Sequence, residues 1–305
     1  MAQFTADDLM FKPGLMTGER ILITGGGTGL GKVMAEALLM LGAEVYICGR
    51  RGGVVEATAQ ELMAAHGGKC VGLACDIRVP EAINEMLDVI WADGGALSGL
   101  VNNAAGNFIS RTQDLSPRGF DAIANIVFRG SFFVTLECGK RWIAEGRRAS
   151  VISILTTWIW NGGPFTVPSA MSKAGIATMS QSLAVEWGQH GIRFNNIAPG
   201  PFPTEGMSAR LNPSQGEETG GAYSDMSGNP MGRVGDMREL ANLAVYLLHP
   251  LSAYVNGQTI AIDGAAWQAS GGNFSRLTGW GETEWTAARE AIQATNAKDR
   301  AARTV

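Results

Sequence analysis

The chain has 305 residues, of which 46% are hydrophobic and 17% are charged, and its net charge is −4. This length and apolar content favour one large α/β domain with a sizeable core over two small domains. The acidic balance and the lack of a Lys/Arg cluster argue against a nucleic-acid partner.

The four cysteines and three histidines have no metal-ligand spacing. The sequence therefore predicts no metal site, and it predicts free thiols of the kind found in a reducing compartment. The first eight residues include two acids and few apolar side chains, so we expect neither a signal peptide nor a membrane-spanning run. A cytoplasmic location is predicted.

Strand-like and helix-like segments alternate from residue 20 to about residue 263. Strands are expected at 20–24, 44–48, 70–75, 97–102, 149–155, 192–197 and 259–263, and helices at 30–41, 54–66, 80–91, 120–143, 170–188 and 236–248. Such alternation predicts an α/β fold class, a Rossmann-type doubly wound parallel sheet in a single domain. We divide the chain into an N-terminal extension at 1–17, the domain at 18–268 and a C-terminal tail at 269–305.

Two stretches break the alternation. Residues 201–232 are rich in Gly, Pro, Ser, Asn and Thr and follow a strand end, which predicts a substrate lid loop; a plain surface loop is the alternative. In the tail, a helix is expected at 282–297. Trp280 and Trp285 suggest that it packs on the body or on a neighbouring subunit, and a frayed terminal helix is the alternative.

A glycine-rich segment follows the first strand and opens a helix. Glycines let the backbone approach a pyrophosphate, and a helix N-terminus favours anions. In this strand-loop-helix context the segment predicts dinucleotide binding. The expected contacts are Thr24, Gly25, Gly27, Thr28, Gly29, Leu30 and Gly31.

The end of the second strand indicates which dinucleotide is bound. An acid there would hydrogen-bond the ribose hydroxyls of NAD, but the chain has Arg50 and Arg51. Two guanidiniums suit a 2′-phosphate, so NADP(H) is predicted. The alternative is that both arginines only cap an exposed loop. Asp76, at the end of the third strand, is expected to contact the adenine.

Four motifs occur together in one order. They are Thr24-Gly25-x-x-x-Gly29-x-Gly31, Asn102-Asn103-Ala104-Ala105-Gly106, Ser169-x-x-x-Lys173 and Pro199-Gly200-Pro201. With them the chain resembles a short-chain dehydrogenase/reductase over about residues 18–268. That family carries Tyr-x-x-x-Lys, whose phenol gives a proton to a carbonyl. Ser169 replaces the phenol here, and a serine hydroxyl is a poor acid, so the usual ketone reduction is not expected.

A narrower resemblance rests on residues 102–110, 133–140, 167–169 and 193–195. These segments resemble 2,4-dienoyl-CoA reductase of the mitochondrial type, a branch that also has Ser at the Tyr position. The resemblance implies that hydride from NADPH attacks the far end of a conjugated dienoyl thioester. Negative charge then moves to the thioester oxygen as an enolate, hydrogen-bond donors hold it, and a proton is supplied to carbon.

The resemblance also implies residue roles. Asn107 would donate to the thioester oxygen, and Lys173 would hold the nicotinamide ribose with Ser169 beside it. Further cofactor contacts are expected at Asn103, Pro199, Gly200, Pro201 and Phe202, and acyl-CoA contacts at Arg78, Phe108, Ser116 and Arg210. Taken alone, Asn107 also suits a turn, and each arginine suits an exposed surface position.

One position departs from that branch, because Trp158 stands where the branch has a second oxygen donor, a tyrosine. An indole N–H donates a hydrogen bond but does not transfer its proton usefully. Trp158 could therefore stabilise the enolate while water protonates carbon, or it could fill the acyl pocket and change the substrate. Apolar packing of Trp158 and Trp160 under the lid is the alternative. Thr156 or Thr157 could orient the substrate.

The leading prediction is an NADPH-dependent reductase of an activated carbon–carbon double bond in an acyl-CoA. A reductase of another enone or enoyl thioester, and a catalytically silent NADP-binding protein, are the alternatives. The helices at 120–143 and 170–188 resemble those that pair subunits in the family, so a homotetramer is expected.

Overall fold

The computed structural model describes residues 5–204, 229–271, 277 and 279–302. Seven parallel strands form one sheet in the order β3-β2-β1-β4-β5-β6-β7. The strands are β1 (Arg20–Thr24), β2 (Glu44–Gly49), β3 (Cys70–Ala74), β4 (Gly99–Asn102), β5 (Ala149–Ile154), β6 (Ile192–Pro199) and β7 (Thr259–Ile262). The order reverses between β1 and β4, as in a doubly wound fold, which confirms the predicted fold class.

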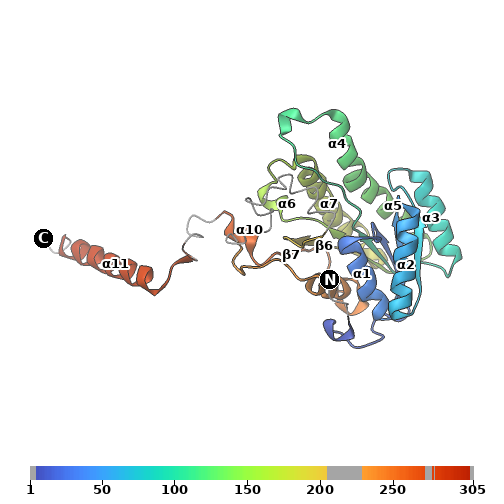
Figure 1. Ribbon diagram of the computed structural model, residues 1–305, viewed down its shortest axis with the longest axis horizontal. Helices are drawn as coiled ribbons and strands as arrows, with labels where there is room; N and C mark the ends of the chain where they lie inside the picture. The colour runs from blue at the N-terminus through green and yellow to red at the C-terminus, as the bar shows by residue number, and fades with distance from the viewer. Residues whose placement is uncertain (1–4, 205–228, 272–276, 278, 303–305) are drawn as a thin grey trace.

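Helices cover both faces of this sheet (Figure 1). The longer ones are α1 (Gly29–Met40), α2 (Gly52–His66), α3 (Pro80–Ala92), α5 (Ser131–Ala144), α7 (Val167–Glu186) and α9 (Met237–Leu248). Short turns of 3₁₀-helix are η1 (Ala6–Asp8), η2 (Thr112–Asp114), η4 (Gly188–His190) and η5 (Pro250–Ser252).

Alternation along the strands divides the core into two layers. Ile21 and Ile23 of β1 pack with residues of α1, α2 and α9, whereas Leu22 packs with residues of α3 and α5 on the other face. Every residue of β1 is buried, and its three central residues are apolar, as expected for a sheet covered on both faces.

The single long helix expected at 120–143 is interrupted. It consists of α4 (Pro117–Ala124), a π-helical turn η3 (Asn125–Gly130) and α5. The turn lies where the helix passes Ile77, because a Cβ added to Gly130 would stand 2.8 Å from that side chain. π-Turns inside α-helices are frequent at functional sites.

This composite helix, Pro117–Ala144, is long and apolar enough to cross a membrane by length and composition, although no membrane-spanning run was expected from the sequence. It is the one helix in the described part of the chain with that property. Buried side chains attach it to the sheet, since Trp142 is fully buried and its indole N–H donates to the Leu97 carbonyl at 2.7 Å. A core helix passes the same test, so the finding is weak support for a span.

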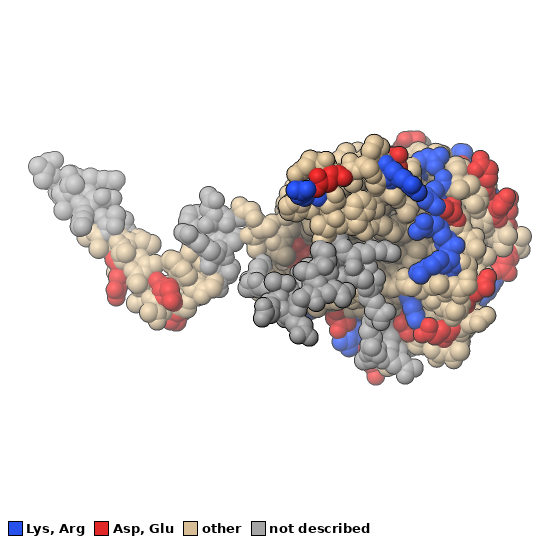
Figure 2. Space-filling view, turned by 45° about the horizontal axis from the view of Figure 1, so that its top comes forward, with Lys and Arg blue, Asp and Glu red and all other residues tan. Residues whose placement is uncertain are grey.

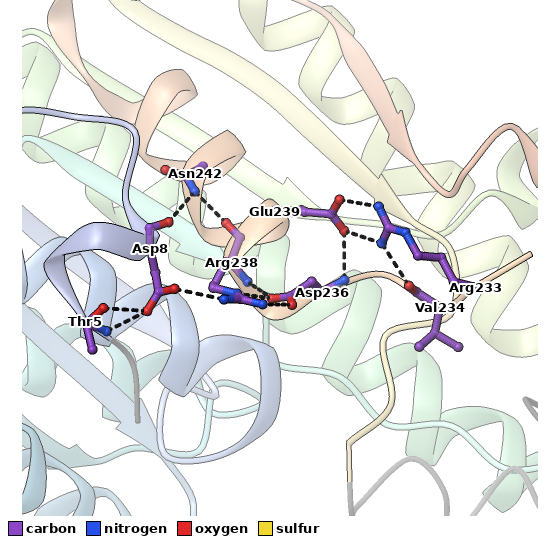
Figure 3. A network of polar contacts seen from close by, with 8 residues as sticks. All are labelled: Thr5, Asp8, Arg233, Val234, Asp236, Arg238, Glu239 and Asn242. Carbon is purple, nitrogen blue, oxygen red and sulfur yellow. Dashed lines mark hydrogen bonds and ion pairs between the residues drawn. The ribbon is translucent and has the colours of Figure 1, made fainter. Parts of the chain in front are cut away.

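The N-terminal extension is attached to α9 through a polar network (Figure 3). The Asp8 carboxylate accepts from Arg238 at 2.9 Å, and Asn242 donates to the Asp8 carbonyl at 3.0 Å. Arg238 also pairs with Asp236, the N-cap of α9. Met16 of the extension is fully buried in the core layer that contains residues of α1 and α9. Of the lid loop expected at 201–232, residues 205–228 lie outside the described residues.

The tail carries α10 (Ala266–Ala269) and α11 (Glu282–Ala302). The expected tail helix is present as α11, which stands away from the body (Figure 1). Trp280 and Trp285 contact each other, with ring centroids 5.0 Å apart.

Candidate active site

A cavity of about 1030 Å³ lies at the carboxyl ends of the strands. Its walls come from the segments that follow β1, β2, β3, β4, β5, β6 and β7. Ligands of open α/β sheets bind at this edge, where the strand order reverses. Figure 2 shows a hollow in the body beside a band of Lys and Arg side chains.

The glycine loop forms one wall and is built for close approach. Gly25 has φ +65°, and a Cβ there would lie 2.9 Å from Ala104 Cα. At Gly31 a Cβ would meet the Gly25 carbonyl oxygen at 2.4 Å, so only glycine fits. Gly25, Gly27, Thr28, Gly29 and Leu30 line the cavity, as expected for backbone that approaches a phosphate.

Thr24 and Asn103 hold this loop in place. The Thr24 hydroxyl accepts from the backbone N–H groups of Asn103 and Ala104, each at 3.0 Å. The Asn103 amide donates to the carbonyls of Thr24 and Gly25, at 3.0 and 3.1 Å. These bonds join the ends of β1 and β4. Asn103 also lines the cavity. Thr24 and Gly31, which were expected to contact the cofactor, are not on the described cavity wall and instead support the glycine loop.

Arg50 and Arg51 follow β2, are exposed and line the cavity beside Asp76. The Asp76 carboxylate is held by Arg78, whose Nε donates to both oxygens at 2.9 and 3.0 Å. These bonds lower the pKa of Asp76, against the opposing effect of its burial. Arg78 is therefore engaged with Asp76, and its expected contact with acyl-CoA stays a prediction.

Lys173 and Ser169 lie one turn apart on α7, and both are buried on the cavity wall. The Lys173 ammonium donates to the carbonyl of Ile154, the last residue of β5. Burial lowers the pKa of Lys173 to about 8, because it removes the ammonium from water and no described carboxylate offsets that effect. An anionic or hydroxyl-rich ligand in the cavity would supply that compensation.

Asn107 lines the cavity, and its side-chain oxygen is bonded within its own loop. The backbone N–H of Phe108 donates to Asn107 Oδ1 at 2.9 Å. A backbone N–H can only donate, so the carbonyl side of the amide is fixed and the NH₂ side is left for a ligand. The loop is tied down further along, where Ser110 N–H donates to the Phe165 carbonyl at 2.9 Å.

The segment after β5 supplies the facing polar groups. Thr156, Thr157 and Trp158 line the cavity, and Trp158 begins the short helix α6 (Trp158–Asn161). The Trp158 indole N–H makes no hydrogen bond to another described residue. After β6, Pro199, Gly200, Pro201 and Phe202 complete the wall.

None of the four residues expected at the acyl-CoA is on the described cavity wall: Arg78 pairs with Asp76, and the other three are Phe108, Ser116 and Arg210. Ser116 is the N-cap of α4, and its hydroxyl accepts from Gly119 N–H at 3.1 Å. Phe108 packs near Gly119 rather than on the described wall. Arg210 lies outside the described residues. Their roles stay predictions.

Several wall residues were not expected from the sequence, among them Cys48, Cys75, Ile126, Asn229 and Ala266. Ile126 comes from the π-turn, and Ala266 from α10. The two cysteines could have been predicted from the sequence, since each stands at a strand end near the arginines or Asp76. Neither Ile126 nor Ala266 carries a motif, because a small apolar wall residue has the sequence pattern of a core residue.

One end of the cavity suits a nicotinamide dinucleotide, because its glycine loop leaves space that a Cβ would fill. The other end is lined by polar side chains and has no phenol among the described wall residues. This combination defines a dinucleotide-dependent oxidoreductase site.

A model of the family described as enoyl-(acyl carrier protein) reductase matches residues 25–265. A probable 2,4-dienoyl-CoA reductase of Caenorhabditis elegans, described as (3E)-enoyl-CoA-producing, is 39% identical, covering 96% of this chain and 95% of the relative. A probable (2E)-enoyl-CoA-producing 2,4-dienoyl-CoA reductase of Bacillus subtilis is 36% identical, covering 83% and 98%. A peroxisomal 2,4-dienoyl-CoA reductase of Danio rerio is 34% identical over 88% of each chain.

Solved structures of dehydrogenases have the same fold. The citronellol catabolism dehydrogenase of Pseudomonas aeruginosa has a TM-score of 0.74 at 33% identity, covering 86% of this chain and 100% of that one. A gluconate 5-dehydrogenase from Burkholderia cenocepacia, in complex with NADP and tartrate, has a TM-score of 0.74 at 27% identity, covering 83% and 96%. The chain belongs to the short-chain dehydrogenase/reductase family and is an oxidoreductase.

Proposed function

We propose that this protein catalyses the NADPH-dependent reduction of a conjugated carbon–carbon double bond in an acyl-CoA, as a 2,4-dienoyl-CoA reductase does. The observation that carries the proposal is the Asn107 side chain, which lines the cavity and whose Oδ1 accepts from the Phe108 N–H, so that the NH₂ group remains as the donor for a thioester oxygen. It shares the cavity with Lys173 and with a serine in place of the phenol. Relatives named 2,4-dienoyl-CoA reductase support the same reaction.

NADPH is proposed over NADH because of the charges after β2. Arg50 and Arg51 line the adenosine end of the cavity, and both are exposed, so a 2′-phosphate could reach them. The solved NADP complex of the gluconate dehydrogenase neighbour is consistent with this choice. When bound, the cofactor supplies a hydride. Lys173 and the glycine loop would hold its ribose and pyrophosphate.

The chain's own residues would manage the charge that develops on the substrate. The overall reaction is dienoyl-CoA + NADPH + H⁺ → enoyl-CoA + NADP⁺. As the double-bond electrons move toward the thioester, its oxygen becomes an enolate, and the Asn107 amide and the Trp158 indole N–H donate to it. Oxygen-directed donors of this kind typically contribute 10²–10³ in rate. Ser169 is a poor acid, so a water molecule delivers the proton to carbon.

The test is NADPH oxidation with trans-2,trans-4-hexadienoyl-CoA and a longer dienoyl-CoA, with NADH in parallel. NADPH-specific turnover with loss of the dienoyl chromophore is expected. Turnover of a simple β-ketoacyl thioester instead would contradict the proposal. Tight NADPH binding with no turnover of any enoyl or dienoyl thioester would favour a silent NADP-binding protein.

Assembly is a further part of the proposal. Phe128, Phe132, Met171 and Val185 are exposed apolar side chains on or beside α5 and α7. They lie on the helices that the sequence analysis assigns to subunit pairing, so we propose a homotetramer that covers them. Light scattering at micromolar concentration is expected to give four times the mass of the chain, and a monomer would contradict this part.

The cytoplasmic location also belongs to the proposal. It rests on the buried free thiols of the described cysteines, which are typical of a reducing compartment. The Danio rerio relative is named as peroxisomal, so the compartment must be measured. A fluorescent fusion is expected to show diffuse cytoplasmic signal, and punctate signal would contradict it.

A further inference from the structure

Two walls of the cavity come from short helices that are far apart in the chain. Trp158 begins α6, after β5, and Ala266 begins α10, after β7. Each helix has four residues, and neither has a fully buried side chain of its own. A single helical turn is not stable by itself, so contacts outside each helix must fix its position.

A pair of tryptophans supplies that contact. The rings of Trp160 on α6 and Trp267 on α10 are stacked, with centroids 4.6 Å apart and planes inclined by 26°. Aromatic pairs in this geometry contribute beyond the area that they bury. A hydrogen bond of 2.9 Å between the Asn161 side-chain amide and the Ser270 hydroxyl joins the same two helices. We call this arrangement the tryptophan clamp, Trp160 with Trp267.

The α10 side of the clamp is itself anchored to the sheet. Asp263, directly after β7, accepts from the backbone N–H of Ala265 at 3.0 Å and from that of Trp267 at 2.9 Å. Asp263 is buried beside Gly200, where a Cβ would lie 2.7 Å from the Asp263 Cβ. The clamp therefore links the wall around Trp158 to a rigid point behind the nicotinamide end.

We propose that Trp267, through its stack on Trp160, is a positioning residue that sets the acyl-chain-length selectivity of this cavity. The inference rests on the proposed function, because it takes an acyl-CoA as the ligand. Trp267 is not on the described wall, but its partner helix carries Trp158 and its own helix carries Ala266. Removing its indole frees both walls to move apart, which makes room for a longer acyl chain.

The test compares Trp267→Ala and Trp267→Phe with the wild type. The ratio of kcat/KM for trans-2,trans-4-decadienoyl-CoA to that for the hexadienoyl-CoA is expected to rise about tenfold in Trp267→Ala, the scale of one or two methylenes in an apolar pocket. Trp267→Phe, which keeps an aromatic ring, is expected to restore most of the wild-type ratio. KM for NADPH is expected to stay within about twofold, a result that general loss of structure would not give.

Trp91→Ala is the matched control, since Trp91 lies on α3, where its indole donates to Glu145, and it is outside the described cavity wall. The ratio is expected to be unchanged there. Calorimetric titration of hexanoyl-CoA and decanoyl-CoA with NADP⁺ present gives a second readout that needs no turnover. A shifted binding ratio in Trp267→Ala without any dienoyl reduction would support the clamp and contradict the proposed reaction. Wild-type turnover with an unchanged ratio in Trp267→Ala, or no acyl-CoA binding at all, would overturn the inference.

Discussion

The backbone N–H of Phe108 fixes the side chain of Asn107 by donating to its Oδ1 at 2.9 Å. Asn107 lines the cavity, so we expect its amide nitrogen to face a bound substrate. A donor that is preorganised in this way stabilises an oxyanion effectively, because no reorganisation is needed during the reaction.

Replacing this donor is expected to slow the reaction without weakening cofactor binding. Asn107→Asp keeps the shape and the oxygen that accepts from Phe108, but it puts an anionic acceptor where the enolate forms. We expect kcat to fall by about 10²–10³ and KM for NADPH to change little. Asn84→Asp on α3 is the matched control, because Asn84 is outside the described cavity wall. A rate within about threefold of wild type for Asn107→Asp would show that the amide is only a turn residue.

The buried charge of Lys173 is expected to oppose folding. Burial lowers its pKa from 10.5 to about 8, so below pH 8 the folded state carries a desolvated ammonium at full cost. Between pH 8 and 10.5 the unfolded chain binds more protons than the folded one, so this contribution makes stability rise with pH. Lys173→Met is expected to increase the free energy of unfolding at pH 7 by up to about 3 kcal/mol, and by less at pH 10.

The same variant is expected to lose NADPH oxidation almost completely, since Lys173 is proposed to hold the cofactor ribose. Urea unfolding at pH 7 and pH 10, with exposed Lys140→Met as control, measures the stability change. A destabilised Lys173→Met protein at pH 7 would show that the ammonium is compensated in the folded state and that burial does not dominate its pKa.

Cofactor selectivity is expected to depend on Arg50 and Arg51. Removing both guanidiniums eliminates charge-assisted hydrogen bonds to a 2′-phosphate, each of which contributes about 1.5–3 kcal/mol. The double variant Arg50→Ala, Arg51→Ala is expected to raise KM for NADPH by about 10²-fold and to leave the constants for NADH within about threefold. Equal increases in KM for NADPH and NADH would show that the arginines only stabilise the loop after β2. Arg147→Ala is the control for the loss of an exposed arginine.

The N-terminal extension is expected to stabilise the domain without contributing to chemistry. Met16 is fully buried, and truncation of such a side chain typically costs about 2–5 kcal/mol. Met16→Ala is expected to lower the free energy of unfolding by that amount and to leave KM for NADPH unchanged. Met10→Ala, at a side chain that is 73% exposed, should change neither. A Met16→Ala protein as stable as wild type would mean that the extension is dispensable.

The order of strands and helices could be predicted because each buried strand is a short apolar run that a glycine or a polar turn ends. Boundaries were missed where local rules compete with tertiary contacts. The helix α7 begins at Val167 rather than at residue 170, because Pro168 is accommodated in its first turn. The π-turn at Asn125–Gly130, whose last residue lies beside Ile77, has no periodic signature in the sequence.

The candidate site divides in the same way. The glycine loop, the arginines and Lys173 could be found because each has a local pattern. The bond from Arg78 to Asp76 spans two residues and was overlooked in favour of a substrate contact. The stack of Trp160 on Trp267 could not be found from the sequence, because α6 and α10 are single turns that are far apart in the chain and meet only in the folded protein.

In the proposed reaction, hydride is delivered to a carbon–carbon double bond and not to a carbonyl. The decisive measurement is turnover of trans-2,trans-4-hexadienoyl-CoA with NADPH that carries deuterium at the transferred position, followed by mass spectrometry of the product. We expect an enoyl-CoA with one deuterium on the acyl chain and an intact thioester. Deuterium bound to a carbinol carbon, or no incorporation despite saturated NADPH binding, would contradict the proposed reaction.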